Sequence, residues 1–412
     1  MGKASLVFQG IELRRIVEGE ASLLVPSTST VSPPSSPVFY NPRMEVSRDI
    51  AIGCLRAYHK MVGRDLKVIE PLTATGVRGI RYAKEVEGVS EVIIGDVNPL
   101  AAELAKRNVE LNGLTGVVRV EKAEANQLLS TMAKPGSRYD VVDLDPFGSP
   151  APYVEAALRA LNSGGLLMLT ATDAPPLCGV YPRVAERRYG GRSLRTEYCH
   201  ELAVRLIMGF ICREAGKLDL AIKPLLSYSL EHHFRVCVLI EVGASKSTFS
   251  FRYLGYVEHC PRCGHRFLKH GIATALEERC PLCGSRLLIG GPLWCGPIQD
   301  RMFVDQVLRE VEASGFRHKR RESSLLSTIV EESQAPPLYY TVDSLSHRLR
   351  SREPPMTSIM EELRSSGFQV YRTHFHPKGL KTDAMINDLL STIARLVKIG
   401  ADDEGYQAYQ HP

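Results

Sequence analysis

The side chains best suited to do chemistry in this sequence stand at the end of an apolar run. Residues Tyr139 to Leu144 are mostly apolar or β-branched, which predicts a buried strand. Asp145, Pro146 and Phe147 follow at once, and Pro146 ends the strand because proline has no N–H to offer the ladder. Open α/β sheets bind their ligands at the carboxyl ends of their strands, so these three residues occupy a ligand-binding position.

A carboxylate, a proline carbonyl and an aromatic ring at that position suit an amino group on a flat base. Asp145 can accept a hydrogen bond from the amino group and, if needed, a proton, while the carbonyl of Pro146 accepts the second N–H. Phe147 offers a face for stacking. The alternative is an ordinary strand exit, because Asp, Pro and Gly are common turn residues, and this short motif alone does not separate the two.

The elements before this strand predict a site for a second ligand. A short strand, Lys67–Glu70, leads into a loop of small residues, Leu72–Gly79, whose glycines let a ligand approach the backbone closely. The next strand, Val92–Asp96, ends in an acid about 20 residues after Gly76, where a carboxylate can bind the two ribose hydroxyls of a nucleoside. After a third strand, Glu124, Ala125 and Asn126 could reach an adenine edge.

Strands that alternate with helices indicate a parallel sheet covered by helices on both faces. A dinucleotide-binding dehydrogenase would share this pattern, but the Leu72–Gly79 loop lacks the GxGxxG sequence that cradles a pyrophosphate. Asp145 and its neighbours would also have no role in hydride transfer. A nucleoside cofactor without phosphates fits better, which favours S-adenosylmethionine.

Two CPxCG sequences predict a metal site. Cys260 and Cys263 are followed, 16 residues on, by Cys280 and Cys283. Two such pairs complete a tetrahedral Zn²⁺ site, and because no open position is indicated, the zinc is expected to be structural. The same spacing favours metal binding in a reducing cytosol over disulfides for the ten cysteines of the chain.

The length of 412 residues suggests two or three domains, and 44% hydrophobic residues with 24% charged residues are ordinary for a globular protein. No apolar run reaches membrane-spanning length and the N-terminus lacks the core of a signal peptide, so a cytoplasmic protein is expected. We place a cofactor-binding domain at 1–243, with an exposed Pro/Ser-rich loop at 26–37. A C-terminal domain at 244–412 would contain a zinc ribbon-like part (257–290) and a winged-helix-like part (336–400).

Basic residues are clustered although the net charge is only +5. Five arginines lie between Arg183 and Arg195, and a second group spans Arg317–Arg321. Either group could be a solvated surface, but clustering favours phosphate binding. A winged helix can contact nucleic acid or protein.

Phe39 and Tyr40, which follow the Pro/Ser-rich loop, have two possible roles. They would either pack against the following helix as a hydrophobic staple or form a lid over a site; the staple is favoured.

These motifs together resemble the tRNA (guanine-26-N2)-dimethyltransferase family (Trm1 type), over about residues 4 to 400. The resemblance rests on five segments: Val38–Pro42, Ser47–Asp49, Ala74–Arg81, Asp143–Gly148, and the terminal Arg372–Phe375 with Lys381–Asp383. It implies a Rossmann-like class I methyltransferase domain, a smaller α+β C-terminal domain, S-adenosylmethionine as methyl donor and tRNA as partner. No obligate protein partner and no membrane association are expected.

The resemblance also implies roles for particular residues. The cofactor would be held by Arg48, Arg78, Asp96, Glu124 and Ala125, with Gly76 of the loop. A guanine pocket would be formed by Phe39, Asp145, Pro146 and Phe147. Two residues depart from the family: Ser47 stands where Asn is common, and Glu70 stands where Asp is common. The change at Glu70 affects how far its carboxyl group can reach toward the methionine end of the cofactor. The alternatives are an amino-methyltransferase acting on another DNA or RNA base, and a zinc-ribbon nucleic-acid-binding protein without activity.

Overall fold

The computed structural model describes residues 6–134 and 136–403. Its centre is a seven-stranded sheet in the order β6-β5-β4-β7-β8-β10-β9. Strands β6, β5, β4, β7 and β8 pair in parallel, whereas β10 pairs antiparallel with both of its neighbours. The bounds are β4 (Leu66–Glu70), β5 (Val89–Asp96), β6 (Val118–Lys122), β7 (Tyr139–Leu144), β8 (Leu161–Ala171), β9 (Leu220–Leu230) and β10 (His233–Val242). The predicted α/β class is confirmed.

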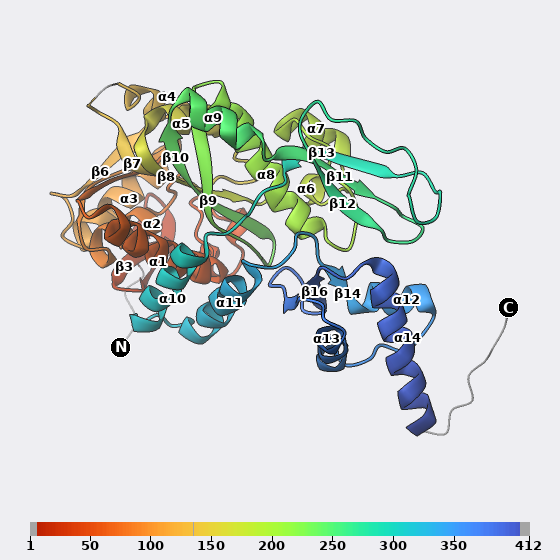
Figure 1. Ribbon diagram of the computed structural model, residues 1–412. Coiled ribbons are helices and arrows are strands. Elements are labelled where there is room, and N and C mark those ends of the chain that lie inside the picture. Colours follow the sequence, from red (N-terminus) through yellow and green to blue (C-terminus); the bar gives the residue numbers. More distant parts are fainter. Residues whose placement is uncertain (1–5, 135, 404–412) are drawn as a thin grey trace.

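Helices cover both faces of this sheet (Figure 1). Because side chains alternate along a strand, Val68 and Val141 point to one face and Ile69 and Val142 to the other. The first face is covered by α1 (Glu45–Val62), α2 (Val77–Glu85) and α3 (Pro99–Leu111). The second is covered by α4 (Ala125–Thr131), α5 (Val154–Ala160) and α8 (Cys199–Gly216).

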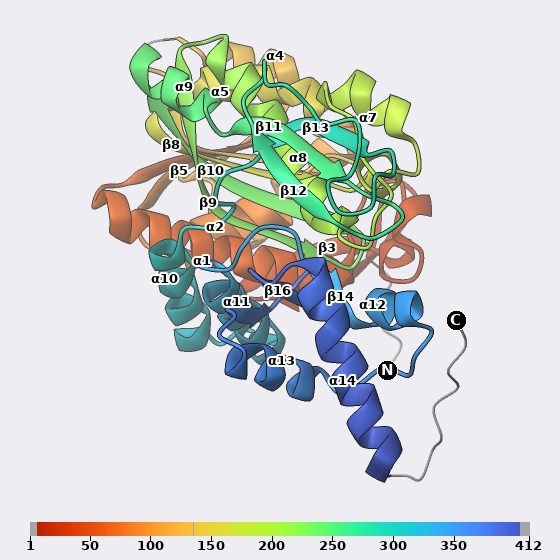
Figure 2. The same ribbon diagram turned by 45° about the vertical axis from the view of Figure 1, so that its right-hand side comes forward.

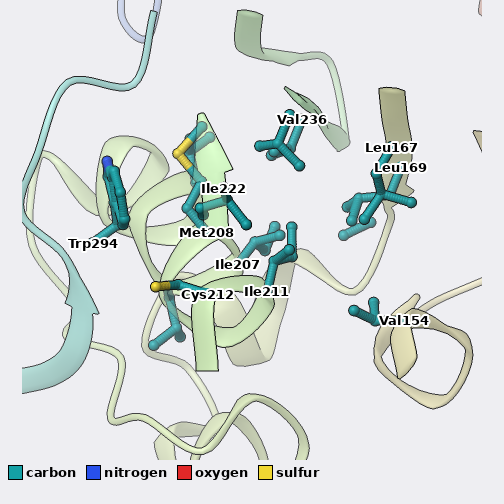
Figure 3. Packing of buried hydrophobic residues seen from close by; sticks show 14 of the residues in the cluster. Val154, Leu167, Leu169, Ile207, Met208, Ile211, Cys212, Ile222, Val236 and Trp294 are labelled. Carbon is teal, nitrogen blue, oxygen red and sulfur yellow. The ribbon is translucent and has the colours of Figure 1, made fainter. Parts of the chain in front are cut away.

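Helix α8 packs in the middle of the larger core. Figure 3 shows Ile207, Met208 and Ile211 of this helix pointing toward the sheet residues Leu167 and Val236. The sequence analysis assigned no helix to this stretch. Its residues are apolar on nearly every side because α8 is covered by the sheet on one side and by residues 244–298 on the other.

The N-terminus forms a small sheet of β1 (Leu6–Phe8), β2 (Ile11–Glu18) and β3 (Ala21–Pro26), in that order. β1 and β2 form a hairpin across Gly10, and β3 pairs antiparallel with β2. The following Pro/Ser-rich residues form two short 3₁₀ turns and are mostly exposed, as expected, although Ser29 is buried and donates to the carbonyl of Val38 at 2.8 Å.

The chain leaves the sheet through α9 (Ala244–Phe251) and a three-stranded sheet of β11 (Leu254–His259), β12 (Arg266–His270) and β13 (Leu288–Trp294). It then returns, because α10 (Arg301–Ala313) and α11 (Lys319–Glu332) pack against α1 (Figure 2). The contact is close: a Cβ on Gly53 of α1 would lie 3.0 Å from Val311 of α10.

The last part of the chain, here called the C-terminal module, has a core of its own. It contains β14 (Tyr340–Thr341), α12 (Val342–Leu349), α13 (Met356–Ser365), β15 (Val370–Arg372), β16 (Gly379–Thr382) and α14 (Ile386–Asp403), with sheet order β14-β16-β15. The module has the winged-helix-like order that was expected: one strand, two helices and then two paired strands. The short strands β14 and β16 were not foreseen.

No helix within residues 6–134 and 136–403 is long and apolar enough to cross a membrane.

Candidate active site

The loop between β4 and α2 is held in a tight conformation. Ala74 has a φ of 50° and Gly76 a φ of 80°, values in the left-handed region that glycine adopts most readily. A Cβ on Gly79 would lie 2.2 Å from Cγ2 of Ile94, so only glycine lets α2 approach β5 this closely. The small residues of this loop therefore serve both its turn and the packing of the helix behind it.

Glu70, at the end of β4, fastens the same loop from below. Its Oε2 accepts hydrogen bonds from the hydroxyl of Thr73 (2.8 Å) and from the N–H of Gly79 (3.0 Å). Burial raises the pKa of Glu70 to about 8, against a smaller opposite effect of Arg78. The side chain is therefore a largely protonated anchor at neutral pH.

The predicted cofactor residues on the next two strands lie at neighbouring strand ends. Asp96 accepts from the N–H of Ala74 (2.9 Å) and of Asn98 (2.8 Å), which ties the loop to the end of β5. Glu124 caps α4 by accepting from the N–H of Gln127 at 2.9 Å and is exposed, while Ala125 is buried. The sheet order places the ends of β4, β5 and β6 side by side.

Asp145 lies at the end of β7 and forms an ion pair with Arg78, whose Nη2 is 2.6 Å from Oδ2. Arg78 is fully buried, whereas the Asp145 side chain keeps 26% of its surface exposed. Behind this pair, Arg235 of β10 binds Asp143 at 2.8 Å and donates to the hydroxyl of Thr170 at 2.8 Å. A row of buried charges thus ends in one carboxylate that faces outward.

This row of charges fixes the ionisation of Asp145. Burial would raise its pKa, but the guanidinium of Arg78, and next that of Arg235, hold the pKa well below its usual range. Asp145 is therefore an anion at neutral pH. It can accept hydrogen bonds from an amino group and stabilise positive charge that develops there, while remaining a weak base.

Phe39 and Phe147 meet, as the predicted guanine pocket requires. Their ring centroids are 4.4 Å apart with an interplanar angle of 82°, so the rings touch edge to face. Phe147 is 73% exposed, and Pro146 before it is buried. The loop that carries them is tied to the end of β8, because the N–H of Gly148 donates to Thr172 at 2.7 Å. A base can stack between the rings only if Phe147 swings outward, which its exposure allows.

Arg48 positions the segment that carries Phe39. Its Nε and Nη2 each lie 2.5 Å from an oxygen of Glu18, and Nη2 also donates to the carbonyl of Asn41 at 3.1 Å. The hydroxyl of Tyr40 donates to the same Glu18 at 2.8 Å. Tyr40 is thus a buried anchor, and its neighbour Phe39 faces the site. The assignment of Arg48 to the cofactor stays a prediction.

The roles of the buried partners behind the site were not predicted from the sequence: Glu18, Tyr82, Asp143, Thr170, His233 and Arg235. A signal was available, because Asp143 and Arg235 are opposite charges inside two mostly apolar strands. His233 carried no such signal. It is buried, its Nε2 has no hydrogen-bond partner, and burial lowers its pKa to about 4.

Both basic groups lie close to this edge of the sheet. α6 (Ala174–Leu177) and α7 (Pro182–Tyr189) follow β8. The first group lies on α7 and on the segment after it, and its members are all exposed: Arg183, Arg187, Arg188, Arg192 and Arg195. In the second group, Arg321 binds Glu231 of the β9–β10 turn at 3.0 Å, and His318 lies 3.5 Å from Glu45 at the start of α1.

The four predicted metal ligands converge in space. The Sγ atoms of Cys260 and Cys283 are 3.4 Å apart, and those of Cys263 and Cys280 are 3.6 Å apart. A tetrahedron with Zn–S bonds of about 2.3 Å has S–S edges of roughly 3.8 Å, so the set is close to the geometry that zinc requires.

A seven-stranded, mostly parallel sheet whose strand ends carry these polar residues defines the chain as a Rossmann-like methyltransferase. The family model described as N2,N2-dimethylguanosine tRNA methyltransferase matches residues 19–394, and the chain belongs to this family.

Curated relatives and a solved structure agree with the family match. A tRNA (guanine(26)-N(2))-dimethyltransferase of Methanosphaera stadtmanae is 36% identical over 92% of this chain and 96% of its own length. The enzyme of the same name from Methanothermobacter thermautotrophicus is 37% identical, over 92% and 98%. The structure of Trm1 from Pyrococcus horikoshii in complex with S-adenosyl-L-methionine has a TM-score of 0.83 and 34% identity, and covers 92% of this chain and 100% of that one.

Proposed function

We propose that this protein transfers methyl groups from S-adenosylmethionine to the exocyclic N2 of the guanine at position 26 of tRNA, giving N2-methylguanosine and N2,N2-dimethylguanosine. The observation that carries the proposal is the ionised, partly exposed Asp145 at the end of β7, held by the buried Arg78. It stands beside the ends of β4, β5 and β6, where the cofactor residues lie.

The residues at those strand ends fit the cofactor. Nη1 of Arg78 and Oδ1 of Asn126 are buried without a hydrogen-bond partner, so each is available to a polar ligand. Asp96 keeps lone pairs beyond its two backbone contacts and would take the ribose, while Gly76, Glu124 and Ala125 would border the adenosine. When bound, S-adenosylmethionine supplies an electrophilic methyl group on its sulfonium.

Guanine N2 is a poor nucleophile because its lone pair is delocalised into the ring, so orientation supplies much of the catalysis. Asp145 and the carbonyl of Pro146 would each accept an N–H, which turns the lone pair away from them and toward the methyl group. The carboxylate also stabilises the positive charge that grows on nitrogen. The proton then leaves to Asp145 or to water, and the low pKa of Asp145 lets it pass on to solvent.

A second transfer would use the N–H that remains. The guanine must be extruded from the folded tRNA to reach Asp145, and stacking against Phe39 and Phe147 would hold it. Phosphates beside the extruded base would meet the arginines of α7 and the Arg317–Arg321 group, which border the same edge of the sheet. We propose further that residues 244–412, with the winged-helix-like part, extend the tRNA contact.

We also propose that Cys260, Cys263, Cys280 and Cys283 bind a structural Zn²⁺, which their closeness supports. A metal site of four thiolates needs reduced cysteines, which favours a location in the reducing cytoplasm.

The proposed function is tested by incubating unmodified tRNA with the protein and S-adenosylmethionine and analysing the nucleosides by mass spectrometry. N2-methylguanosine should appear first and N2,N2-dimethylguanosine should follow. Methylation of adenosine or cytidine instead, or a product only on DNA, would refute the proposal.

A further inference from the structure

A second cluster of metal-ligating side chains lies apart from the four CxxC cysteines. Cys178, Cys199 and His200 each offer one ligand atom, and these atoms lie within 4.8 Å of one another. The two thiols form no disulfide. The four-cysteine cluster meets the same criterion of closeness. We propose that Cys178, Cys199 and His200 form a second Zn²⁺ site.

The composition of the cluster favours zinc. Two thiolates and an imidazole are soft and borderline ligands, and a set of two Cys and one His with a fourth, non-protein ligand is an established tetrahedral zinc arrangement. A hydrogen bond between two thiols would stabilise the pair only weakly, since S–H is a weak donor. Cys199 begins α8, a helix of 18 residues, and the positive end of the helix dipole stabilises a thiolate there.

His200 is oriented as a metal ligand would be. Its Nδ1 lies 3.3 Å from the carbonyl oxygen of Phe375. Donation from Nδ1 to a backbone carbonyl fixes the tautomer and leaves the lone pair on Nε2, the arrangement that usually supports a ligating histidine.

One polar atom beside the Phe375 contact lacks a partner. The ring of Tyr339 stacks on that of Phe375, and its hydroxyl is buried without a hydrogen bond. Buried hydroxyls usually have a hydrogen-bond partner, and a water bound to the metal in the fourth position would be a suitable one.

The cluster lies beside the contact between the large sheet and the C-terminal module, which indicates a structural role for the metal. Cys178 ends α6 and Cys199 begins α8, both on the side of the large sheet, whereas Phe375 belongs to the C-terminal module. The residue after His200, Glu201, binds Lys381 of that module at 3.2 Å. A zinc ion here would join α6 to α8 and fix the ring of His200, whose Nδ1 contacts the carbonyl of Phe375 in the C-terminal module.

The test is the zinc stoichiometry of the full-length protein, stripped with a chelator under reducing conditions and titrated with Zn²⁺ alone. Wild type should bind two equivalents. Cys178→Ser with Cys199→Ser should bind one, and Cys260→Ser with Cys280→Ser should bind the other. Cys212→Ser, a buried cysteine of the same helix α8, is the matched control and should keep both.

His200→Asn provides a milder variant, because its amide can still donate to the Phe375 carbonyl. It should weaken the second site by at least the roughly 10- to 100-fold that loss of an outer-shell partner costs a metal site. One equivalent in wild type, abolished by the Cys260/Cys280 variant alone, would overturn the proposal. A Cys178–Cys199 disulfide in the freshly purified protein, seen by mass spectrometry, would overturn it as well.

Discussion

At the scale of single residues, the site depends on charges that the sequence places inside strands. The role of the Asp145-Pro146-Phe147 motif could be predicted without a structure, because a carboxylate, a carbonyl and an aromatic ring at a strand end suit the binding of an amino group on a base. Its support could not, because the ion pair between Arg78 and Asp145, at 2.6 Å, joins two elements that are far apart in the sequence. The side-chain direction that pairs two residues 67 positions apart is a property of packing, which a local pattern does not contain.

Asp145→Asn should keep cofactor binding and lower methyl transfer by about 100-fold or more, the scale of losing one donor or acceptor to the transition state. The amide presents an N–H to the amino group and leaves Arg78 without its anion. Turnover of radiolabelled methyl groups and a cofactor titration measure the two effects separately. Asp173→Asn, an acid just after the neighbouring strand, is the control; near-normal turnover of the Asp145 variant would remove this residue from the mechanism.

Glu70 should give stability a pH dependence that Glu70→Gln removes. The folded pKa of about 8 lies above the unfolded value of about 4.3, so the folded state holds a proton that the unfolded state has lost. The contribution of Glu70 to the free energy of unfolding should therefore fall between about pH 4 and pH 8 and stay level above. Each pKa unit is worth about 1.4 kcal/mol, so the effect amounts to several kcal/mol.

Chemical denaturation of wild type and Glu70→Gln at pH 5 and pH 8 measures this. The variant should lose less stability than wild type over that interval. Glu91→Gln is the control: burial would raise the pKa of Glu91, but hydrogen bonds from Tyr139 and Lys67 lower it, so Glu91 is ionised in both states between pH 5 and pH 8 and its loss should leave the difference unchanged. Parallel curves for wild type and Glu70→Gln would show that Glu70 titrates normally.

At the scale of elements, long segments with turn signals at their ends were foreseen and others were not. β7 spans Tyr139–Leu144, as its apolar run ended by Pro146 predicts. Helix α8 has apolar residues on nearly every side and therefore shows no amphipathic period. β14 has two residues, which is too short for alternation to register. Such elements are fixed by their neighbours.

A metal ion bound by the four cysteines should hold the two CPxCG turns together. Cys260→Ser with Cys280→Ser should release zinc and lower the melting temperature, because structural zinc contributes folding free energy directly. Since β13 packs on α8 and pairs with β11, the loss should extend beyond the cluster by several degrees. Metal analysis and calorimetry measure both; zinc-free wild type, or unchanged melting of the variant, would contradict the assignment.

At the scale of the whole molecule, the chain folds back on itself. The division at residue 243 was drawn from a change in composition, yet α10 and α11 lie against α1 and bring Arg317–Arg321 to the edge of the sheet where Asp145 lies. A return of this kind depends on contacts between residues far apart in the sequence, such as Gly53 and Val311. A single sequence does not display them.

Arg320→Ala with Arg321→Ala should weaken tRNA binding and reduce its salt dependence while leaving affinity for S-adenosylmethionine intact. Each phosphate contact contributes a log–log slope of roughly −0.7 to −0.9, so the slope should flatten by up to about two such units. Filter binding at several salt concentrations measures it. Arg119→Ala with Arg159→Ala, exposed arginines on β6 and α5, is the matched control. An unchanged slope would make the Arg317–Arg321 group a solvated surface only.

The site at Asp145 should methylate one amino group at one position of tRNA. The test is to digest tRNA that has reacted with the protein and S-adenosylmethionine, and to locate the added methyl groups by fragment mass spectrometry. We expect up to two methyl groups on the guanine at position 26, none when adenine replaces it, and none with Asp145→Asn. Equal methylation of the adenine-26 tRNA, or of the guanine by the Asp145→Asn variant, would contradict this expectation.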